Sequence, residues 1–159
     1  MSGVRKSILS PLIIITAIIF QMLWRGLPHF YADAFNFLSI AVILLALRHG
    51  EGIGAFCGSL AGLIQDSLTL HVFGLAGLTK TSLGFIVGLG YRKLNLASFI
   101  NQVLFIFAVS AFELLLWASL ANLIFSFNPP FHLGWFWLQP LTTTLVTGFV
   151  FRLINQYND

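Results

Sequence analysis

Apolar residues fill this chain in long runs that are separated by short polar or glycine- and proline-containing connections. The runs that we expect to form helices cover residues 8–24, 32–47, 50–66, 73–91, 98–124 and 134–151. A hydrocarbon core of about 30 Å needs roughly 20 apolar residues in a helix, and most of these runs approach that length. The run over 32–47 is short, with Asp33 at its mouth. The pattern predicts one compact all-α membrane domain over residues 1–159, a bundle of six transmembrane helices.

The low charge content of the chain also points to a membrane environment. Only 8% of the 159 residues are charged and 58% are hydrophobic, whereas a soluble domain usually carries about 25% charged residues. So few charges could not cover the surface of a soluble fold. Lipid is therefore the expected solvent.

Basic residues near the ends of the runs predict the orientation in the membrane. With a cytoplasmic N-terminus, the residues that fall on the cytoplasmic side are Arg5, Lys6, Arg48, Arg92, Lys93 and Arg152. Only Arg25 falls outside, so the positive-inside rule places both termini in the cytoplasm. The first run lacks the small-residue cleavage site of a signal peptide, and we expect it to remain as a helix. The basic residues form no stripe typical of nucleic-acid binding, so no nucleic-acid partner is expected.

Glycines recur every fourth residue in the third and fourth runs. They are Gly50, Gly54, Gly58 and Gly62 in the third run, and Gly77, Gly84 and Gly88, with Thr81 between them, in the fourth. Helices in lipid gain nothing hydrophobic by touching each other, so close backbone approach must drive their association, and small residues permit it. We expect these stripes to form tight helix–helix seams, with a partner helix in this chain or in another.

The ionisable residues inside the apolar runs or at their ends include Asp66, Lys80 and Glu113. Asp66 ends the third run, and Lys80 lies about 8–12 Å below the outer surface at 1.5 Å per residue. A lysine stem can extend several ångströms toward the interface, so we expect an ion pair between Asp66 and Lys80. Glu113, at a comparable depth in the fifth run, is the alternative partner of Lys80. One acid and one base without a relay of further acids or histidines favour a structural pair over a proton pathway.

The sixth run carries polar residues on one face. Gln139, Thr143 and Thr147 recur every fourth residue, and we expect them to turn inward, where their side chains can bond carbonyl groups or a ligand. Pro140 lies in the same run and is expected to kink the helix, because it removes a backbone hydrogen bond.

Catalytic and metal-binding motifs are not visible in the sequence. It has no glycine loop followed by Lys-Ser/Thr, no paired carboxylates on one helix and no Ser–His–Asp order typical of a hydrolase. The single cysteine, Cys57, lies in an apolar run and has no metal-ligand spacing around it. We therefore expect a protein that is not an enzyme and that holds no cofactor or metal.

Residues 28–91 carry motifs that resemble a known family. A glycine-rich run leads into Gly-Leu-Ile-Gln-Asp at 62–66, and Gly-Leu-x-Gly-Leu follows at 74–78. With the basic N-terminus and the acid that opens the second run, these motifs resemble MreD, the rod shape-determining membrane protein of bacteria. The residues that carry the resemblance best are Asp66, Gly58, Gly62, Gly74, Gly77 and Gly84. MreD sequences commonly place Pro-Asp before the second helix, whereas here the proline is Pro28 and the acid follows as Ala32-Asp33.

The resemblance implies a scaffold in the bacterial cytoplasmic (inner) membrane. Such a scaffold would bind MreC and, through it, the wall-elongation machinery, which comprises MreB filaments, the RodA glycosyltransferase and its partner transpeptidase. The MreD family also resembles the substrate-binding subunits of energy-coupling-factor transporters in having six helices, so uptake of a vitamin or other small molecule is the main alternative. Those subunits often carry an Ala-x-x-x-Ala patch on the first helix, whereas residues 8–24 contain only Ala17. A channel would need a polar lining across several helices, and only the sixth run has a polar stripe.

Overall fold

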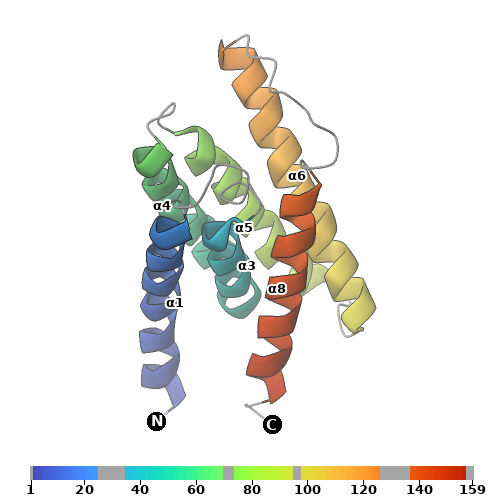
Figure 1. The fold of residues 1–159 in the computed structure, drawn as a ribbon. Coiled ribbons are helices and arrows are strands. Elements are labelled where there is room, and N and C mark those ends of the chain that lie inside the picture. Colours follow the sequence, from blue (N-terminus) through green and yellow to red (C-terminus); the bar gives the residue numbers. More distant parts are fainter. Residues whose placement is uncertain (1, 25–34, 70–73, 95–97, 126–136, 157–159) are drawn as a thin grey trace.

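The computed structural model describes residues 2–24, 35–69, 74–94, 98–125 and 137–156. Every regular element within these ranges is a helix. The helices are α1 (Ser2–Trp24), α3 (Phe37–His49), α4 (Glu51–Thr69), α5 (Leu75–Lys93), α6 (Phe99–Phe125) and α8 (Leu138–Gln156). Figure 1 shows that they pack as one bundle, in which α1 begins and α8 ends at the same end. The all-α prediction is confirmed.

Each predicted run coincides with one helix, although several ends differ. The second helix begins at Phe37 instead of residue 32, because Asn36 caps it: the Asn36 Oδ1 accepts a hydrogen bond from the Ser39 N–H at 3.2 Å. An asparagine side chain is well suited to this position, since it replaces a missing intrahelical acceptor. Asp33, which we expected at the mouth of this helix, lies outside the described residues.

The proline of the last helix does not lie where the sequence suggested. Helix α8 begins at Leu138 instead of residue 134, so Pro140 is its third residue. A proline in the first helical turn removes no intrahelical hydrogen bond, because the N–H groups there have no partner within the helix. The kink was expected because Pro140 would remove a hydrogen bond inside the helix, and that reason is wrong for a proline in the first turn.

Helix α3 forms the centre of the bundle. Its residues 38–47 are all buried, and it contacts α1, α4, α5 and α8. A helix that is apolar on every side is typical of a buried core position. With 13 residues, α3 is about 20 Å long, which is shorter than the hydrocarbon core of a bilayer.

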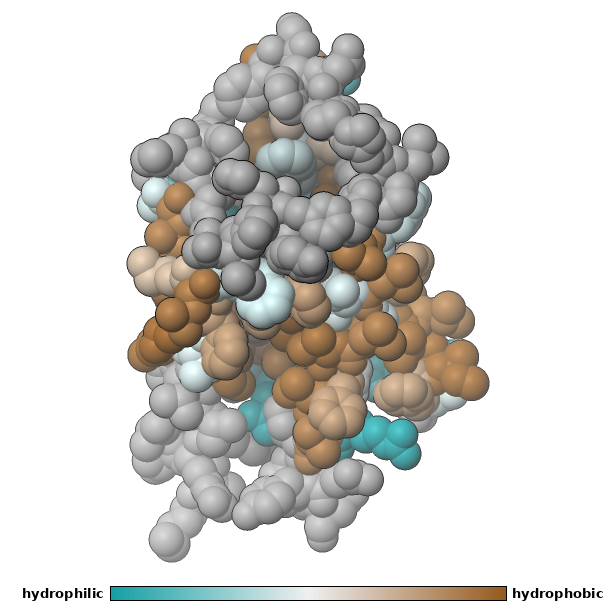
Figure 2. Space-filling model, in the orientation of Figure 1, coloured by the Kyte–Doolittle hydropathy of each residue, from teal (hydrophilic) through white to brown (hydrophobic). Residues whose placement is uncertain are grey.

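The outer surface of the described residues is strongly apolar. Large side chains stand exposed on the peripheral helices, among them Leu23, Ile100, Leu123 and Leu145. Figure 2 shows apolar side chains gathered across the middle of the face in view. Among the described helices, the segment Phe99–Ile124 of α6 is long and apolar enough to cross a membrane by itself, and Ile13–Trp24 and Phe37–His49 are shorter apolar helices.

Candidate functional site

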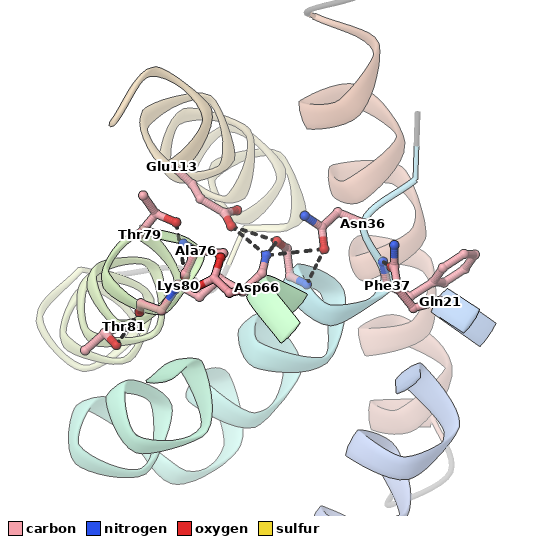
Figure 3. Close-up of polar contacts among 11 residues, drawn as sticks. Gln21, Asn36, Phe37, Asp66, Ala76, Thr79, Lys80, Thr81 and Glu113 are labelled. Atoms are coloured by element: carbon pink, nitrogen blue, oxygen red, sulfur yellow. Dashed lines mark hydrogen bonds and ion pairs between the residues drawn. The ribbon is translucent and has the colours of Figure 1, made fainter. Parts of the chain in front are cut away.

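A lysine lies at the centre of the bundle with all three of its ammonium hydrogens engaged. Lys80 of α5 is only 1% exposed. Its Nζ lies 2.8 Å from Oε1 of Glu113 on α6, donates to Oδ1 of Asn36 at 3.2 Å and also donates to Oγ of Ser39. An ammonium group has three donors, so these three acceptors satisfy it completely. Figure 3 shows Glu113, Lys80 and Asn36 pointing toward one another from three separate segments.

The groups around Lys80 also bond to each other. The Ser39 hydroxyl donates to Oε1 of Glu113 at 2.8 Å, and Oδ1 of Asn36 accepts both from Lys80 and from the Ser39 N–H. One cluster, formed by Asn36, Ser39, Lys80 and Glu113, thus joins the start of α3 to α5 and α6. We call it the lysine cluster. Buried charges are stable only when they are paired and hydrogen-bonded in this way.

The start of α3 is also tied to α1. The Phe37 N–H donates to Oε1 of Gln21 at 3.0 Å, and Gln21 is buried. The first N–H groups of a helix have no intrahelical acceptor, and here the side chains of Gln21 and Asn36 provide two. The sequence reasoning missed Gln21, Asn36 and Ser39. The signal that could have found Asn36 is an asparagine directly before an apolar helical run.

The predicted ion pair between Asp66 and Lys80 is wrong, and the alternative partner, Glu113, is the one found. The Asp66 carboxylate is instead bound by backbone N–H groups at the start of α5. Oδ2 accepts from Gly74 at 2.9 Å and from Gly77 at 3.2 Å, and Oδ1 accepts from Ala76 at 3.0 Å.

The physical reason lies in the way that α5 begins. Gly74, its N-cap residue, has a positive φ of 98° and makes no side-chain hydrogen bond to the helix. The first N–H groups of α5 therefore need an acceptor from elsewhere, and a carboxylate also complements the positive end of the helix dipole. Asp66, in the last turn of α4, supplies that acceptor. Asp66 is 3% exposed, so we describe it as a buried cap that fixes the connection between α4 and α5.

The two glycine stripes meet in the structure. At Gly54, Gly58 and Gly62 of α4, an added β-carbon would lie under 3.0 Å from backbone atoms of α5 at Gly84, Lys80 and Ala76, respectively. Gly84 and Gly88 are equally tight against the backbone at Gly54 and Gly50–Glu51. The residue pairs run in opposite directions, so α4 and α5 are antiparallel. The partner helix of each stripe is therefore in the same chain.

Gly77 differs from the glycines of the seam that lie against backbone, which are Gly54, Gly58, Gly62, Gly84 and Gly88. A β-carbon there would meet the Leu63 side chain at 3.6 Å, which is an ordinary contact distance. Its role lies in its backbone, because its N–H donates to Asp66. The seam and the lysine cluster are also coupled, since Gly58 lies directly against the carbonyl of Lys80.

The polar face of α8 turns inward, toward α6 and α3. Thr143 and Thr147 are buried, Gln139 is half-buried, and α8 contacts both of those helices. Thr144, which the sequence reasoning did not single out, is also buried and donates to the Pro140 carbonyl at 2.7 Å. Within the described residues, the Thr147 Oγ1 is buried without a hydrogen-bond partner.

Metal-binding residues do not gather within the described part of the chain. It contains no group of three His, Cys, Asp or Glu placed to hold a metal ion, and the thiol of Cys57 is free and buried. A groove of about 160 Å³ lies between α1 and α3, lined by apolar side chains and Thr16. The charged residues of the lysine cluster do not line this groove.

Comparison with known proteins adds no relative. No protein-family model matches the chain, and neither a curated protein nor a solved structure matches it.

Proposed function

We propose that the protein is a non-enzymatic scaffold of the bacterial cytoplasmic membrane, similar to MreD. In this proposal the six helices form a multi-pass bundle with both termini in the cytoplasm. The scaffold binds MreC and, through it, the MreB filaments, the RodA glycosyltransferase and its partner transpeptidase, and so helps to maintain rod shape.

The observation that carries the proposal is the convergence of the motif residues on one joint. Gly58 and Gly62 lie against α5, and Asp66 accepts hydrogen bonds from Gly74 and Gly77. The residues by which the sequence resembles MreD therefore meet in one hairpin of α4 and α5. A motif that served only to make a helix apolar would not require these contacts.

The chemistry of the lysine cluster supports a structural role. Lys80 has a full set of acceptors, and Glu113 is paired with it. A proton or ion pathway needs groups that exchange partners with water, whereas these groups bond each other across three helices. We infer that the cluster sets how α3, α5 and α6 are arranged and thereby holds a surface in shape for protein partners.

The apolar exterior supports the membrane location. Large apolar side chains are exposed on α1, α4, α5, α6 and α8. Contact of such a surface with lipid is favourable, whereas its exposure to water is not. The glycines of α4 and α5 lower the apolar character of these two helices. In the proposed bundle the glycines of the two stripes lie in the tight seam between the helices, where the backbone contacts protein and not lipid.

Co-purification tests the proposal directly. The tagged full-length chain is extracted in detergent from a rod-shaped bacterium that makes it, and the proteins that accompany it are identified. We expect MreC among them. The Gly62→Leu variant should lose MreC, because it separates α4 from α5, whereas Gly52→Leu should keep it, because no atom lies within 4 Å of a β-carbon at Gly52.

The same experiment identifies the rival function. Recovery of an ATPase module instead of MreC would indicate a subunit of an uptake transporter and would overturn the scaffold proposal. Recovery of neither from cells in which MreC is present would also overturn it.

A further inference from the structure

Basic side chains gather at one end of the bundle, where α3 and α5 end and α4 begins. Arg92 of α5 places its Nη1 2.6 Å from Oε1 of Glu51, the first residue of α4. Its stem lies beside Gly50, where an added β-carbon would be 3.7 Å from the Arg92 Cδ. Arg48 precedes this turn in the last turn of α3, and Lys93 follows Arg92 directly and is exposed.

The end of α8 brings a fourth cation to the same end. The rings of Tyr91 and Phe151 contact each other with their centroids 6.1 Å apart, so the last turn of α5 lies against the region of α8 that carries Arg152. The guanidinium of Arg152 lies over the ring of Phe99, 5.5 Å from its centroid. We call Arg48, Arg92, Lys93 and Arg152 the basic end.

The positive charges at the basic end outnumber the negative ones, and they are accessible to a ligand. Among the described residues, Glu51 is the only acid there. The side chain of Arg92 is 68% exposed although it is paired with Glu51, so most of its fork of donors is free to bind another group. Figure 2 shows hydrophilic residues near the end of the molecule where α1 begins and α8 ends, below the apolar side chains in the middle of that face.

The surroundings of these cations are those of a membrane interface. Tyr91 and Phe99 are 38% and 49% exposed beside them, and aromatic rings next to basic residues are typical of the level of lipid headgroups. An arginine fork matches the geometry of a phosphate oxygen pair, and a nearby lysine adds a point charge. The basic and aromatic residues lie at the ends of the helices and not on a domain that extends beyond them. This position favours the phosphodiester group of a lipid over an acidic protein surface as their ligand.

We propose that the basic end binds the headgroup of an anionic phospholipid, with Arg48, Arg92 and Lys93 around its phosphate and Arg152 beside it. Glu51 competes with the phosphate for Arg92. The inference rests on the proposed membrane location, but it does not involve MreC, and its test needs no partner protein.

The test uses the purified full-length chain in nanodiscs. The protein's retention of fluorescent phosphatidylglycerol is compared with its retention of fluorescent phosphatidylcholine. The midpoint of thermal unfolding is measured in discs of each of the two lipids. We expect preferential retention of phosphatidylglycerol and a higher midpoint in its presence. Each of Arg92→Gln and Lys93→Gln should weaken the retention about fivefold, the effect of one basic residue at an anionic surface.

The matched control is Glu51→Gln, which breaks the same ion pair from the other side. If the pair merely joins α4 to α5, Glu51→Gln and Arg92→Gln should have the same effect. If the cations bind lipid, Glu51→Gln should strengthen retention of phosphatidylglycerol while Arg92→Gln weakens it. Lys93→Gln breaks no ion pair in the described structure, so it tests the lipid site without that complication.

Three outcomes would overturn the proposal. They are equal retention of the two lipids, parallel effects of Glu51→Gln and Arg92→Gln, and equal stabilisation by soluble glycerol phosphate, which would mean a site for free phosphate. The scaffold proposal would survive each of them as long as MreC is recovered with the protein.

Discussion

Lys80 and Glu113 form a buried ion pair between α5 and α6, with Nζ and Oε1 2.8 Å apart and side-chain exposures of 1% and 8%. The pair is joined to the start of α3 through Ser39 and Asn36. Removal of one member leaves the other charged and without an opposite charge in an apolar interior, which destabilises a protein far more than removal of both. The arrangement of three helices therefore depends on two residues that are far apart in the sequence.

A double-mutant cycle tests this dependence. Lys80→Met and Glu113→Gln should each lower the free energy of unfolding by about 3–5 kcal/mol. The double variant Lys80→Met/Glu113→Gln should lose less than the sum of the single losses, because no charge is left unpaired. Reversible denaturation in detergent provides the measurement, and Arg92→Gln, in an exposed pair, is the control that should change stability little. Strict additivity of the two changes would show that the residues are not coupled.

Asp66 should stabilise the protein through its hydrogen bonds to the start of α5 and not through an ion pair with Lys80. Asp66→Ala leaves the N–H groups of Gly74, Ala76 and Gly77 without their acceptor and should lower stability by about 1–3 kcal/mol. Asp66→Asn should be milder, since its amide oxygen still accepts. Ser67→Ala is the control, because the exposed Ser67 hydroxyl donates within its own helix, to the Leu63 carbonyl, and to no other group in the described part of the chain. Coupling between Asp66→Asn and Lys80→Met in a cycle would contradict this separation.

The seam predicts a graded response to added side chains. Gly58→Ala should destabilise by at least the 1–3 kcal/mol typical of overpacking, because its β-carbon would meet the backbone of Lys80. Gly77→Ala should be tolerated better at the seam, and Gly52→Ala should be close to neutral, since nothing lies within 4 Å of its β-carbon. Size-exclusion profiles and thermal midpoints give the ranking, and equal tolerance at Gly58 and Gly52 would disprove the close approach.

Two threonines in consecutive turns of α8 should respond differently to the loss of their hydroxyl groups. Thr144→Val removes a hydrogen bond to the Pro140 carbonyl and should destabilise by about 0.5–1.5 kcal/mol. Thr147→Val removes a buried hydroxyl that has no partner among the described residues, so it should leave stability unchanged or raise it. Thermal unfolding of both variants is the measurement. A loss at Thr147→Val would mean that its hydroxyl binds a group such as an internal water.

The orientation in the membrane is open to a reporter assay. Alkaline phosphatase, which is active only in the periplasm, should give no signal when fused after Asp159 and a strong signal when inserted in the connection over 126–133. The reason is the excess of basic residues on the predicted cytoplasmic side. An insertion at 95–97, on the same side as the C-terminus in the six-helix topology, serves as the silent control. A strong signal after Asp159 would rule out the six-helix topology with both termini in the cytoplasm.

Much of the fold could be read from local patterns. The apolar runs gave each helix to within six residues at either end, because a helix is specified by its own stretch of chain and by residues such as Asn36 at its start. The four-residue spacing of Gly54, Gly58 and Gly62 predicted a close contact, because it places small residues on one face of a helix. It left open whether the partner was in this chain, and the structure identifies it as α5.

The sequence by itself determined an apolar, helical chain with glycine seams and a few charges that require partners. Only the tertiary structure decided which partners those charges have. The depth of Lys80 along its helix was compatible with both Asp66 and Glu113, since depth is one coordinate and a long side chain spans the difference. The choice depends on how α5 is rotated and where it crosses α3 and α6, which is set by packing between segments far apart in the chain. The Asp66 carboxylate accepts hydrogen bonds from N–H groups at the start of α5, which have no acceptor within their own helix. Lys80 pairs with Glu113 instead.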